Sequence, residues 1–213
     1  MKSVVRKLHL LESDNCLTLA FLSSAEIDKY FTYKEKVLIN KILGLAGGIS
    51  GKQADHQVLI ARQFLVGVPS KTGKVLVNRC LNDRFRRLNV AMLATIGMRL
   101  YISSGYRSPY YQALIFTRIL SENLIRPNKV YTRVASPRIS DHCNPLNPAI
   151  DVENKFGLPS SHEPSLFDQT IEYKWLSTNA RYFYFKQAYI GNEDKIMNEP
   201  WHWDYCKGKH RVL

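Results

Sequence analysis

The sequence predicts an α+β fold, with a small, largely antiparallel sheet flanked by helices and a mainly helical N-terminal extension. Helix-like apolar spacing, short alternating stretches and the separation of the two along the chain predict this class. The length of 213 residues suits one well-packed domain, or one domain with an extension. The apolar fraction of 45% is ordinary for a soluble globular protein.

The first part of the chain, residues 1–76, is expected to be an accessory segment in front of a main domain formed by residues 77–213. Ser24 is the expected N-cap of one helix. A second helix is expected over residues 36–45, ended by Gly47-Gly48. Residues 55–66 fit either a helix or a strand, and no motif assigns a role to this segment.

The main domain shows clearer signals for its elements. Apolar spacing predicts a helix over 82–97 that Gly97 ends, and alternation predicts a strand over 99–104. Ser108-Pro109 opens the next helix, which runs to about Leu124, because serine caps a helix and proline suits its first position. The remaining expected elements are a strand over 150–152, a helix over 166–180, a strand over 182–189 and a last strand over 201–205.

The net charge of +12 is concentrated in one part of the chain. Residues 1–130 carry 20 Lys and Arg against 8 Asp and Glu, whereas residues 131–213 carry 10 of each. A basic face fits an anionic polymer, such as nucleic acid or the charged polymers of a cell wall. The alternative is a solvated basic surface without a dedicated partner. No nucleic-acid-binding motif is present, so nucleic acid is the less favoured partner.

Cysteines and apolar runs exclude several classes of protein. The four cysteines have no C-x-x-C pairing, which argues against a zinc ribbon, and it stays open whether Cys143 and Cys206 pair. The basic start is followed by Glu12 and Asp14, so no secretory signal is recognised. No stretch reaches the apolar length of a membrane-spanning helix.

The most informative stretch is Glu199-Pro200-Trp201-His202-Trp203-Asp204-Tyr205. If it is a strand, the three aromatic residues share one face, while His202 and Asp204 share the other. A histidine on the polar face with Glu199 beside it suits a metal ligand next to a general base. A buried, hydrogen-bonded histidine is the alternative for this run alone.

Two further segments occur upstream in a characteristic order. One is Ser103-Ser104-Gly105-Tyr106-Arg107-Ser108 with Gln112, and the other is Ser140-Asp141-His142 followed by Ala149-Ile150-Asp151. With the EPWHW run, this order resembles the zinc D-alanyl-D-alanine carboxypeptidases of the VanY-like type. That group is related to lysostaphin-like peptidases and the hedgehog signalling domain. The resemblance runs from about Val77 to Lys207 and includes residues 167–180.

The resemblance implies a set of ligands and a set of chemical roles. His142, Asp151 and His202 would hold one Zn²⁺ and leave a fourth position for water, as catalytic zinc sites do. Glu199 would be the general base, and Arg107 would bind a carboxylate or stabilise the oxyanion. A surface carboxylate and a loop-holding arginine are the alternatives for these two residues.

Three polar residues near the motifs are weaker candidates. Gln112 and Ser140 are expected to contact substrate, although an exposed glutamine or a loop-shaping serine would look the same. Asp141 stands where the family often has glutamate and would support a ligand from outside the metal shell. His162 matches no family ligand and is expected to be solvent-exposed.

One departure from the family pattern concerns the loop between two ligands. The family usually has S-x-H-x-x-G-x-A-x-D, whereas His142 and Asp151 are nine positions apart, two more than in that pattern, and the glycine is missing. Asn144-Pro145 and Asn147-Pro148 fill the gap as turn formers. The loop path is therefore expected to differ, and metal binding survives if Asp151 still returns to the same strand.

The expected function is that of a zinc-dependent peptidase cleaving peptidoglycan stem peptides as a D-alanyl-D-alanine carboxypeptidase, with the basic N-terminal half contacting an anionic cell-wall polymer. One alternative is a phage-type L-alanyl-D-glutamate endopeptidase, which the missing leader and the basic half favour somewhat. The other is a non-catalytic zinc-fold binding protein, against which Glu199 and Arg107 argue. Action at the cell wall, periplasmic or extracellular, is expected, by an export route that the sequence leaves open.

Overall fold

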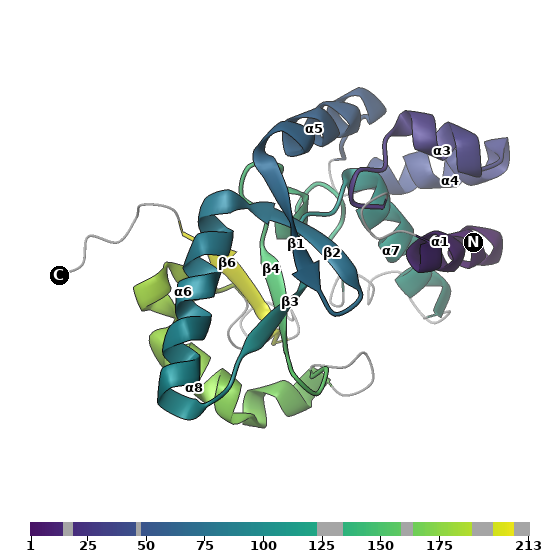
Figure 1. The fold of residues 1–213 in the computed structure, drawn as a ribbon. Coiled ribbons are helices and arrows are strands. Elements are labelled where there is room, and N and C mark those ends of the chain that lie inside the picture. Colours follow the sequence, from purple (N-terminus) through teal and green to yellow (C-terminus); the bar gives the residue numbers. More distant parts are fainter. Residues whose placement is uncertain (15–18, 46–47, 123–133, 159–163, 189–197, 207–213) are drawn as a thin grey trace.

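The computed structural model describes residues 1–14, 19–45, 48–122, 134–158, 164–188 and 198–206, and confirms the α+β class (Figure 1). Its longer helices are α1 (Lys2–Asp14), α3 (Ser24–Tyr30), α4 (Tyr33–Leu43), α5 (Gly51–Phe64), α6 (Arg79–Ile96), α7 (Pro109–Glu122) and α8 (Ile171–Asn179). Short 3₁₀ turns cover Asp141–Cys143, Pro164–Gln169 and Ala180–Phe183. The strands are β1 (Leu65–Ser70), β2 (Gly73–Asn78), β3 (Leu100–Ser104), β4 (Ile150–Asn154), β5 (Phe185–Gln187) and β6 (His202–Tyr205).

Two antiparallel sheets organise the chain. β1 and β2 form a hairpin, and the other strands form a four-stranded sheet in the order β3-β4-β6-β5. Every described pairing is antiparallel. The helices α6 and α8 pack on one face of the larger sheet, and α1, α3, α4 and α5 gather around α7 at the other end of the molecule (Figure 1).

The N-terminal helices begin at capping boxes. The N-cap of α3 is Ser23 rather than the expected Ser24, because Ser23 and Glu26 form the reciprocal pair of bonds. Thr32 and Glu35 do the same for α4. Residues 51–64 form a helix, which decides between the two expectations for this stretch, and Ser50 caps it.

The hairpin was not expected from the sequence, which before residue 77 allowed at most one strand, within residues 55–66. Its apolar residues stand next to one another, Leu65 and Val66 in one arm and Val75 to Val77 in the other, so they give no alternating pattern, and each arm is only six residues long. The hairpin packs tightly on the end of β3. A Cβ atom placed on Gly105 would lie 2.3 Å from the Leu76 carbonyl oxygen, so only glycine fits there.

Two expected elements of the C-terminal half are wrong in extent. The helix expected over 166–180 is broken, because Thr170 ends a 3₁₀ turn and caps a new helix through the Tyr173 amide. The strand expected over 182–189 is limited to Phe185–Gln187 in the described residues. Tyr184 has φ of 67°, a left-handed conformation that ends the preceding 3₁₀ turn and delays the strand.

Two main apolar cores correspond to these two groups of elements. One joins α1, α3, α4 and the start of α5 to Tyr110, Ala113, Leu114 and Phe116 of α7. The other lies between α6, α8 and the four-stranded sheet and includes Phe85, Ile150, Phe167 and Trp203. Among the described residues, no helix is both long and apolar enough to cross a membrane.

Candidate metal and catalytic site

Three neighbouring strands bring polar residues to one level of the sheet. Ser104 of β3 pairs with Asp151 of β4, and Asp151 pairs with His202 of β6. Ile150 and Val152, on either side of Asp151, are buried in the core that α6 and α8 cover. Because side chains alternate along a strand, Asp151 points to the opposite face of the sheet. The site therefore lies on the face that these two helices leave open.

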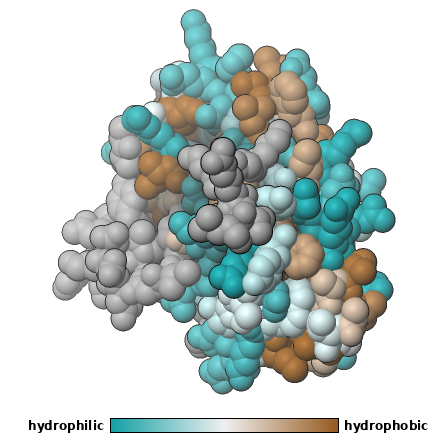
Figure 2. Space-filling model, turned by 90° about the vertical axis from the view of Figure 1, so that its left-hand side faces the viewer, coloured by the Kyte–Doolittle hydropathy of each residue, from teal (hydrophilic) through white to brown (hydrophobic). Residues whose placement is uncertain are grey.

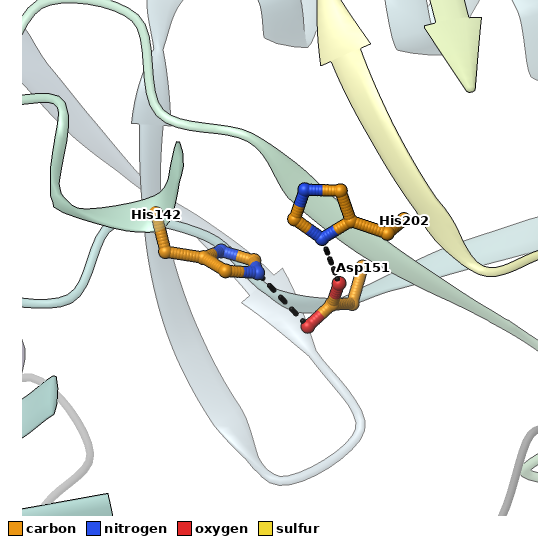
Figure 3. Close-up of side chains that lie close together, drawn as sticks. All are labelled: His142, Asp151 and His202. Atoms are coloured by element: carbon orange, nitrogen blue, oxygen red, sulfur yellow. Dashed lines mark hydrogen bonds and ion pairs between the residues drawn. The ribbon is translucent and has the colours of Figure 1, made fainter. Parts of the chain in front are cut away.

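His142, Asp151 and His202 converge on this face (Figure 3). Asp151 Oδ2 lies 3.2 Å from His142 Nε2, and Asp151 Oδ1 lies 3.0 Å from His202 Nδ1. The imidazole rings are edge to face, with centroids 4.8 Å apart. One donor atom from each residue lies within 4.8 Å of the others, which suits a shared metal ion.

The outer contacts of the histidines orient their rings. His142 Nδ1 lies 2.9 Å from the Gly105 carbonyl oxygen, so this nitrogen donates and leaves Nε2 facing Asp151. His202 Nε2 lies 3.7 Å from Asp141 Oδ2, which leaves Nδ1 facing Asp151. Such outer contacts select the ring nitrogen available to a metal. Gly105 is a part of the site that the sequence motif contained but did not explain.

The charges of the cluster suit ligation. Burial opposes ionisation of Asp151, but the adjacent His142 and His202 hold its pKa well below the ordinary value. Burial, reinforced by Arg107, lowers the pKa of His142, which keeps that ring neutral. Burial also disfavours the charged form of His202, but the carboxylates of Asp141 and Asp151 outweigh it and raise its pKa to about 10. His202 must therefore release a proton when it binds a metal.

Glu199 lies beside the cluster in a tight turn. The His202 amide donates to the Glu199 carbonyl oxygen at 3.1 Å, and the Trp203 indole donates to the Pro200 carbonyl oxygen at 3.0 Å. This turn places Glu199 Oε2 3.8 Å from His202 Nδ1. Burial, followed by the charge of Asp151, raises the pKa of Glu199 to about 7. A carboxyl group with such a pKa can accept and return a proton near neutral pH.

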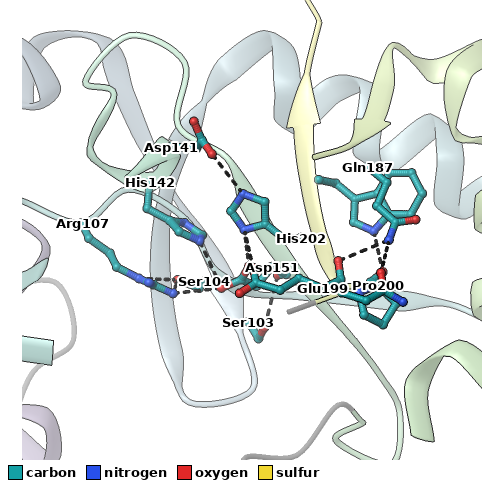
Figure 4. A network of polar contacts seen from close by, with 12 residues as sticks. Ser103, Ser104, Arg107, Asp141, His142, Asp151, Gln187, Glu199, Pro200 and His202 are labelled. Carbon is teal, nitrogen blue, oxygen red and sulfur yellow. Dashed lines mark hydrogen bonds and ion pairs between the residues drawn. The ribbon is translucent and has the colours of Figure 1, made fainter. Parts of the chain in front are cut away.

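Arg107 occupies the other side of the cluster (Figure 4). Its Nη2 donates to Asp151 Oδ2 at 2.9 Å and to Ser104 Oγ at 2.7 Å. The Arg107 amide donates to the His142 carbonyl oxygen at 3.0 Å, which ties the two motifs together. About a fifth of the Arg107 side chain, 19%, is exposed.

The two weaker candidates are buried. Gln112 is 1% exposed. Its side-chain oxygen accepts a hydrogen bond from Arg107 Nη1 at 3.4 Å, and its side-chain nitrogen donates to the Ala135 carbonyl oxygen at 2.9 Å. Gln112 therefore contacts Arg107 from the interior of the protein. Ser140 is 7% exposed and begins the turn that carries His142. His162 lies outside the described residues.

The longer loop between His142 and Asp151 is held at both sides. Asn78 Nδ2 donates to the Leu146 carbonyl oxygen at 2.8 Å, and Asn147 Nδ2 donates to the Tyr205 carbonyl oxygen at 2.7 Å. Asn147 therefore ties the loop that carries two of the clustered residues to the strand that carries the third. Sequence reasoning identified Asn147 only as a turn former.

The question of a Cys143–Cys206 disulfide is answered by the structure. Both cysteines are free thiols, as is Cys80. Cys143 is buried, and burial raises the pKa of its thiol to about 12. The thiol next to His142 is therefore protonated and does not compete as a metal ligand at neutral pH.

A family model matches most of the chain. The model for VanY, D-alanyl-D-alanine carboxypeptidase, matches residues 74–208, which is more than half of the chain. The chain belongs to this family. The match spans the hairpin arm β2, the four-stranded sheet and all the residues that cluster at its open face. A search of curated protein sequences finds no match.

Several solved structures of peptidases share the fold. The LdcB LD-carboxypeptidase is 29% identical, with a TM-score of 0.52 over 61% of this chain and 59% of that chain. VanYB in complex with D-alanine-D-alanine is 24% identical, with a TM-score of 0.52 over 66% and 77%. A VanY D,D-pentapeptidase in complex with Zn(II) is 24% identical, with a TM-score of 0.51 over 68% and 80%. The chain thus spans about three fifths of the length of LdcB.

Proposed function

We propose that this protein is a zinc-dependent peptidase that removes the terminal D-alanine from peptidoglycan stem peptides. The observation that carries the proposal is the convergence of His142, Asp151 and His202 on one sheet face, with Glu199 3.8 Å from His202 and Arg107 2.9 Å from Asp151. Membership of the VanY family and the Zn(II) complex of a structural relative support it. Action at the cell wall follows from this substrate.

The donor set fits zinc. Two imidazole nitrogens and one carboxylate form the three-residue set typical of catalytic zinc, and each histidine has an outer oxygen partner that orients it. When bound, zinc would supply Lewis acidity to the scissile carbonyl and to the attacking water. His142, Asp151 and His202 would hold it.

The other residues would move the proton and hold the substrate. Glu199 would accept the proton of the attacking water and deliver it to the leaving amine, for which a pKa of about 7 is suited. Arg107 would bind the terminal carboxylate or the oxyanion, since a guanidinium donates two parallel hydrogen bonds. Gln112 and Ser104 would hold the guanidinium in place.

A second candidate differs only in the bond cleaved. The 29% identity to LdcB favours an LD-carboxypeptidase, which removes a D-residue that follows an L-residue. An endopeptidase that cuts between L-alanine and D-glutamate is a further alternative.

The deciding experiment is mass spectrometry of the products that the purified, zinc-loaded protein makes from defined tripeptide, tetrapeptide and pentapeptide stems. Loss of one alanine from the pentapeptide alone is the expected result. Loss of alanine from the tetrapeptide instead would favour the LD reaction, and release of free L-alanine would favour the endopeptidase. No cleavage by a protein that holds zinc would contradict the proposal and favour a binding protein.

We also propose that the N-terminal helices form an accessory segment in front of a peptidase domain. The boundary expected between residues 76 and 77 falls inside β2, so the hairpin, whose Val68 and Val77 lie in the sheet core, belongs with the peptidase domain. The separate apolar core around α1, α3 and α4 supports this division. Helix α7 of the peptidase domain completes that core, so the accessory helices pack directly on the catalytic part.

A further inference from the structure

A segment of 31 residues accounts for half of the net positive charge of the protein. Residues 71–101 contain seven Lys and Arg and a single Asp, a net charge of +6 out of +12. This segment folds into the end of the hairpin, α6 and the beginning of β3. The charge is therefore gathered around one helix and its two neighbouring strands.

The arginines of α6 lie on its outward side. Leu81, Phe85, Leu88 and Met92 bury the inner side of the helix in the sheet core. Arg79, Arg86 and Arg87 fall between these positions and are exposed. Figure 2 views the molecule from the left-hand side of Figure 1, where α6 and α8 lie, and shows hydrophilic residues between apolar patches.

We define the basic face as Lys74, Arg79, Arg86, Arg87 and Arg99. All five side chains are exposed. In the described ranges, none of them forms an ion pair within 4 Å, and the only acidic residue of the segment, Asp83, is exposed on α6. Lys71 pairs with Glu153 at 3.9 Å, and Arg84 stacks on the ring of Tyr184. The five cations of the basic face are thus left without a close ion pair among the described residues.

A groove of about 650 Å³ runs between α6, β1 and β3 beside this face. Asn82, Arg86 and Arg99 contribute polar groups to it, and its lining includes no carboxylate. Asn89 bonds both the amide and the carbonyl of Leu100 at 2.9 Å, so this point on the edge of β3 cannot pair with an added peptide strand. The groove is therefore better suited to a polyanion than to strand addition.

Helix α6, which carries three of the five cations, and the metal cluster lie on opposite faces of the four-stranded sheet. Ile150 and Val152 face the core under α6, whereas Asp151 faces the other way. A polymer bound along α6 would leave the cluster accessible to a peptide.

We propose that the basic face binds a phosphate-rich anionic polymer of the cell wall and thereby holds the enzyme next to its substrate. Four of its five cations are arginines, whose planar guanidinium groups pair with phosphate oxygens through two hydrogen bonds. The choice of a wall polymer over another polyanion rests on the proposed function, whereas the polyanion site itself rests on the charge and the groove.

The test is cosedimentation of the full-length protein with purified walls that carry their phosphate polymer, and with the same walls after hydrofluoric acid has removed it. We expect R79Q/R86Q/R87Q/R99Q to be retained roughly tenfold less than the unaltered protein on the untreated walls at about 0.1 M salt. The matched control is K2Q/K34Q/K41Q/K52Q, which removes four exposed charges from the N-terminal helices and should be retained normally.

Cleavage of a soluble stem peptide and the melting temperature should be the same in both variants, which shows that the fold and the site are intact. The proposal would be overturned if the unaltered protein were retained equally on treated and untreated walls. It would also be overturned if the control variant lost as much retention as the basic-face variant. Binding of duplex DNA that is lost in the basic-face variant, with retention on walls unaffected, would assign the face to nucleic acid instead. Wall retention is measured independently of cleavage. If the protein proves not to be a peptidase, the retention measurement still decides whether the basic face binds the polymer.

Discussion

Asp151 and His202 are directly opposed across β4 and β6, with Asp151 Oδ1 3.0 Å from His202 Nδ1, although 51 positions separate them in the sequence. The antiparallel register therefore sets the geometry of the cluster. A slip of β6 by one position would turn His202 into the apolar core and Trp203 toward the open face. Packing of Trp203 and Tyr205 in the core thus holds the histidine in place.

The first prediction concerns the metal. H142A, D151A and H202A should each lose stoichiometric zinc, because each removes one of three converging donors. Elemental analysis of the purified proteins measures this. H56A is the control, since His56 is exposed on α5 and should leave one zinc per chain. Zinc retained by all three variants would place the metal elsewhere.

The second prediction concerns proton transfer. E199Q should keep its zinc but lose about two to four powers of ten in turnover, because Glu199 is not in the ligand cluster and its loss removes a general base. Zinc content and cleavage rate should be measured on one preparation. E153Q, two residues beyond Asp151 on β4, is the matched control and should cleave normally. Undiminished turnover in E199Q would remove this residue from the mechanism.

The third prediction concerns the longer ligand loop. N147A should weaken zinc binding by roughly tenfold, because Asn147 ties this loop to the end of β6. Loss of the hydrogen bond should also cost about 1 kcal/mol of stability. Competition with a chromophoric chelator gives the affinity, and the visible spectrum of the cobalt-substituted protein reports the ligand geometry. L146A alters a half-exposed side chain of the same loop and should change neither readout. An unchanged affinity in N147A would show that the tie is dispensable.

The order and type of most helices and strands in the C-terminal half could be predicted from the sequence, but the breaks within them could not. Alternation in residues 99–104 and 201–205 predicted β3 and β6, the two strands that flank β4 at the site. Ser108-Pro109 marked the start of α7. Thr170 and Tyr184 were missed as breaks because their effect depends on a local cap and a left-handed backbone, which apolar spacing does not record.

The sequence correctly predicted that the three candidate ligands are neighbours, but it did not predict which residues hold them in place. Gly105 and Asn147 act through main-chain contacts with residues distant in the sequence, and such contacts leave no spacing pattern. Gln112 was expected at the substrate, whereas the fold buries it behind Arg107. The hairpin could not be predicted because its arms are short and polar near the turn. Its place in the fold depends on the close contact between Leu76 and Gly105, which no sequence pattern records.

The fourth prediction concerns stability and pH. Glu35 is 7% exposed and binds Lys7 Nζ at 2.6 Å and the Thr32 amide at 2.8 Å. Burial opposes ionisation, but the Lys7 ammonium and the Thr32 bonds lower the pKa of Glu35 to about 2. A depressed carboxyl pKa stabilises the fold above the unfolded value of 4.5, and this contribution is lost as the pH falls toward about 2.

E35Q should therefore lower the free energy of unfolding on the order of 2 kcal/mol at neutral pH, with a difference that shrinks below about pH 4.5. Urea titrations at several pH values measure it. Asp28, which is mostly exposed and pairs with Lys36 on the surface, supplies the control D28N, which should cost little at any pH. A pH-independent effect of E35Q would mean that packing, not charge, is lost.

The last prediction separates a carboxypeptidase from an endopeptidase. A carboxypeptidase must recognise a free carboxylate next to the scissile bond, and Arg107 is the motif cation that lies beside the cluster, 2.9 Å from Asp151. Amidation of the C-terminus of a pentapeptide stem should then abolish cleavage. R107A should slow cleavage of the free acid by about two to three powers of ten, the scale of a lost oxyanion or carboxylate contact, and R107K should recover part of it. Because Arg107 also touches Asp151, zinc content must be shown to be unchanged in both variants. Cleavage of the amidated peptide at the rate of the free acid would contradict the carboxypeptidase reaction. It would favour cutting inside the stem, with Arg107 retained only to hold Asp151 and the His142 turn in place.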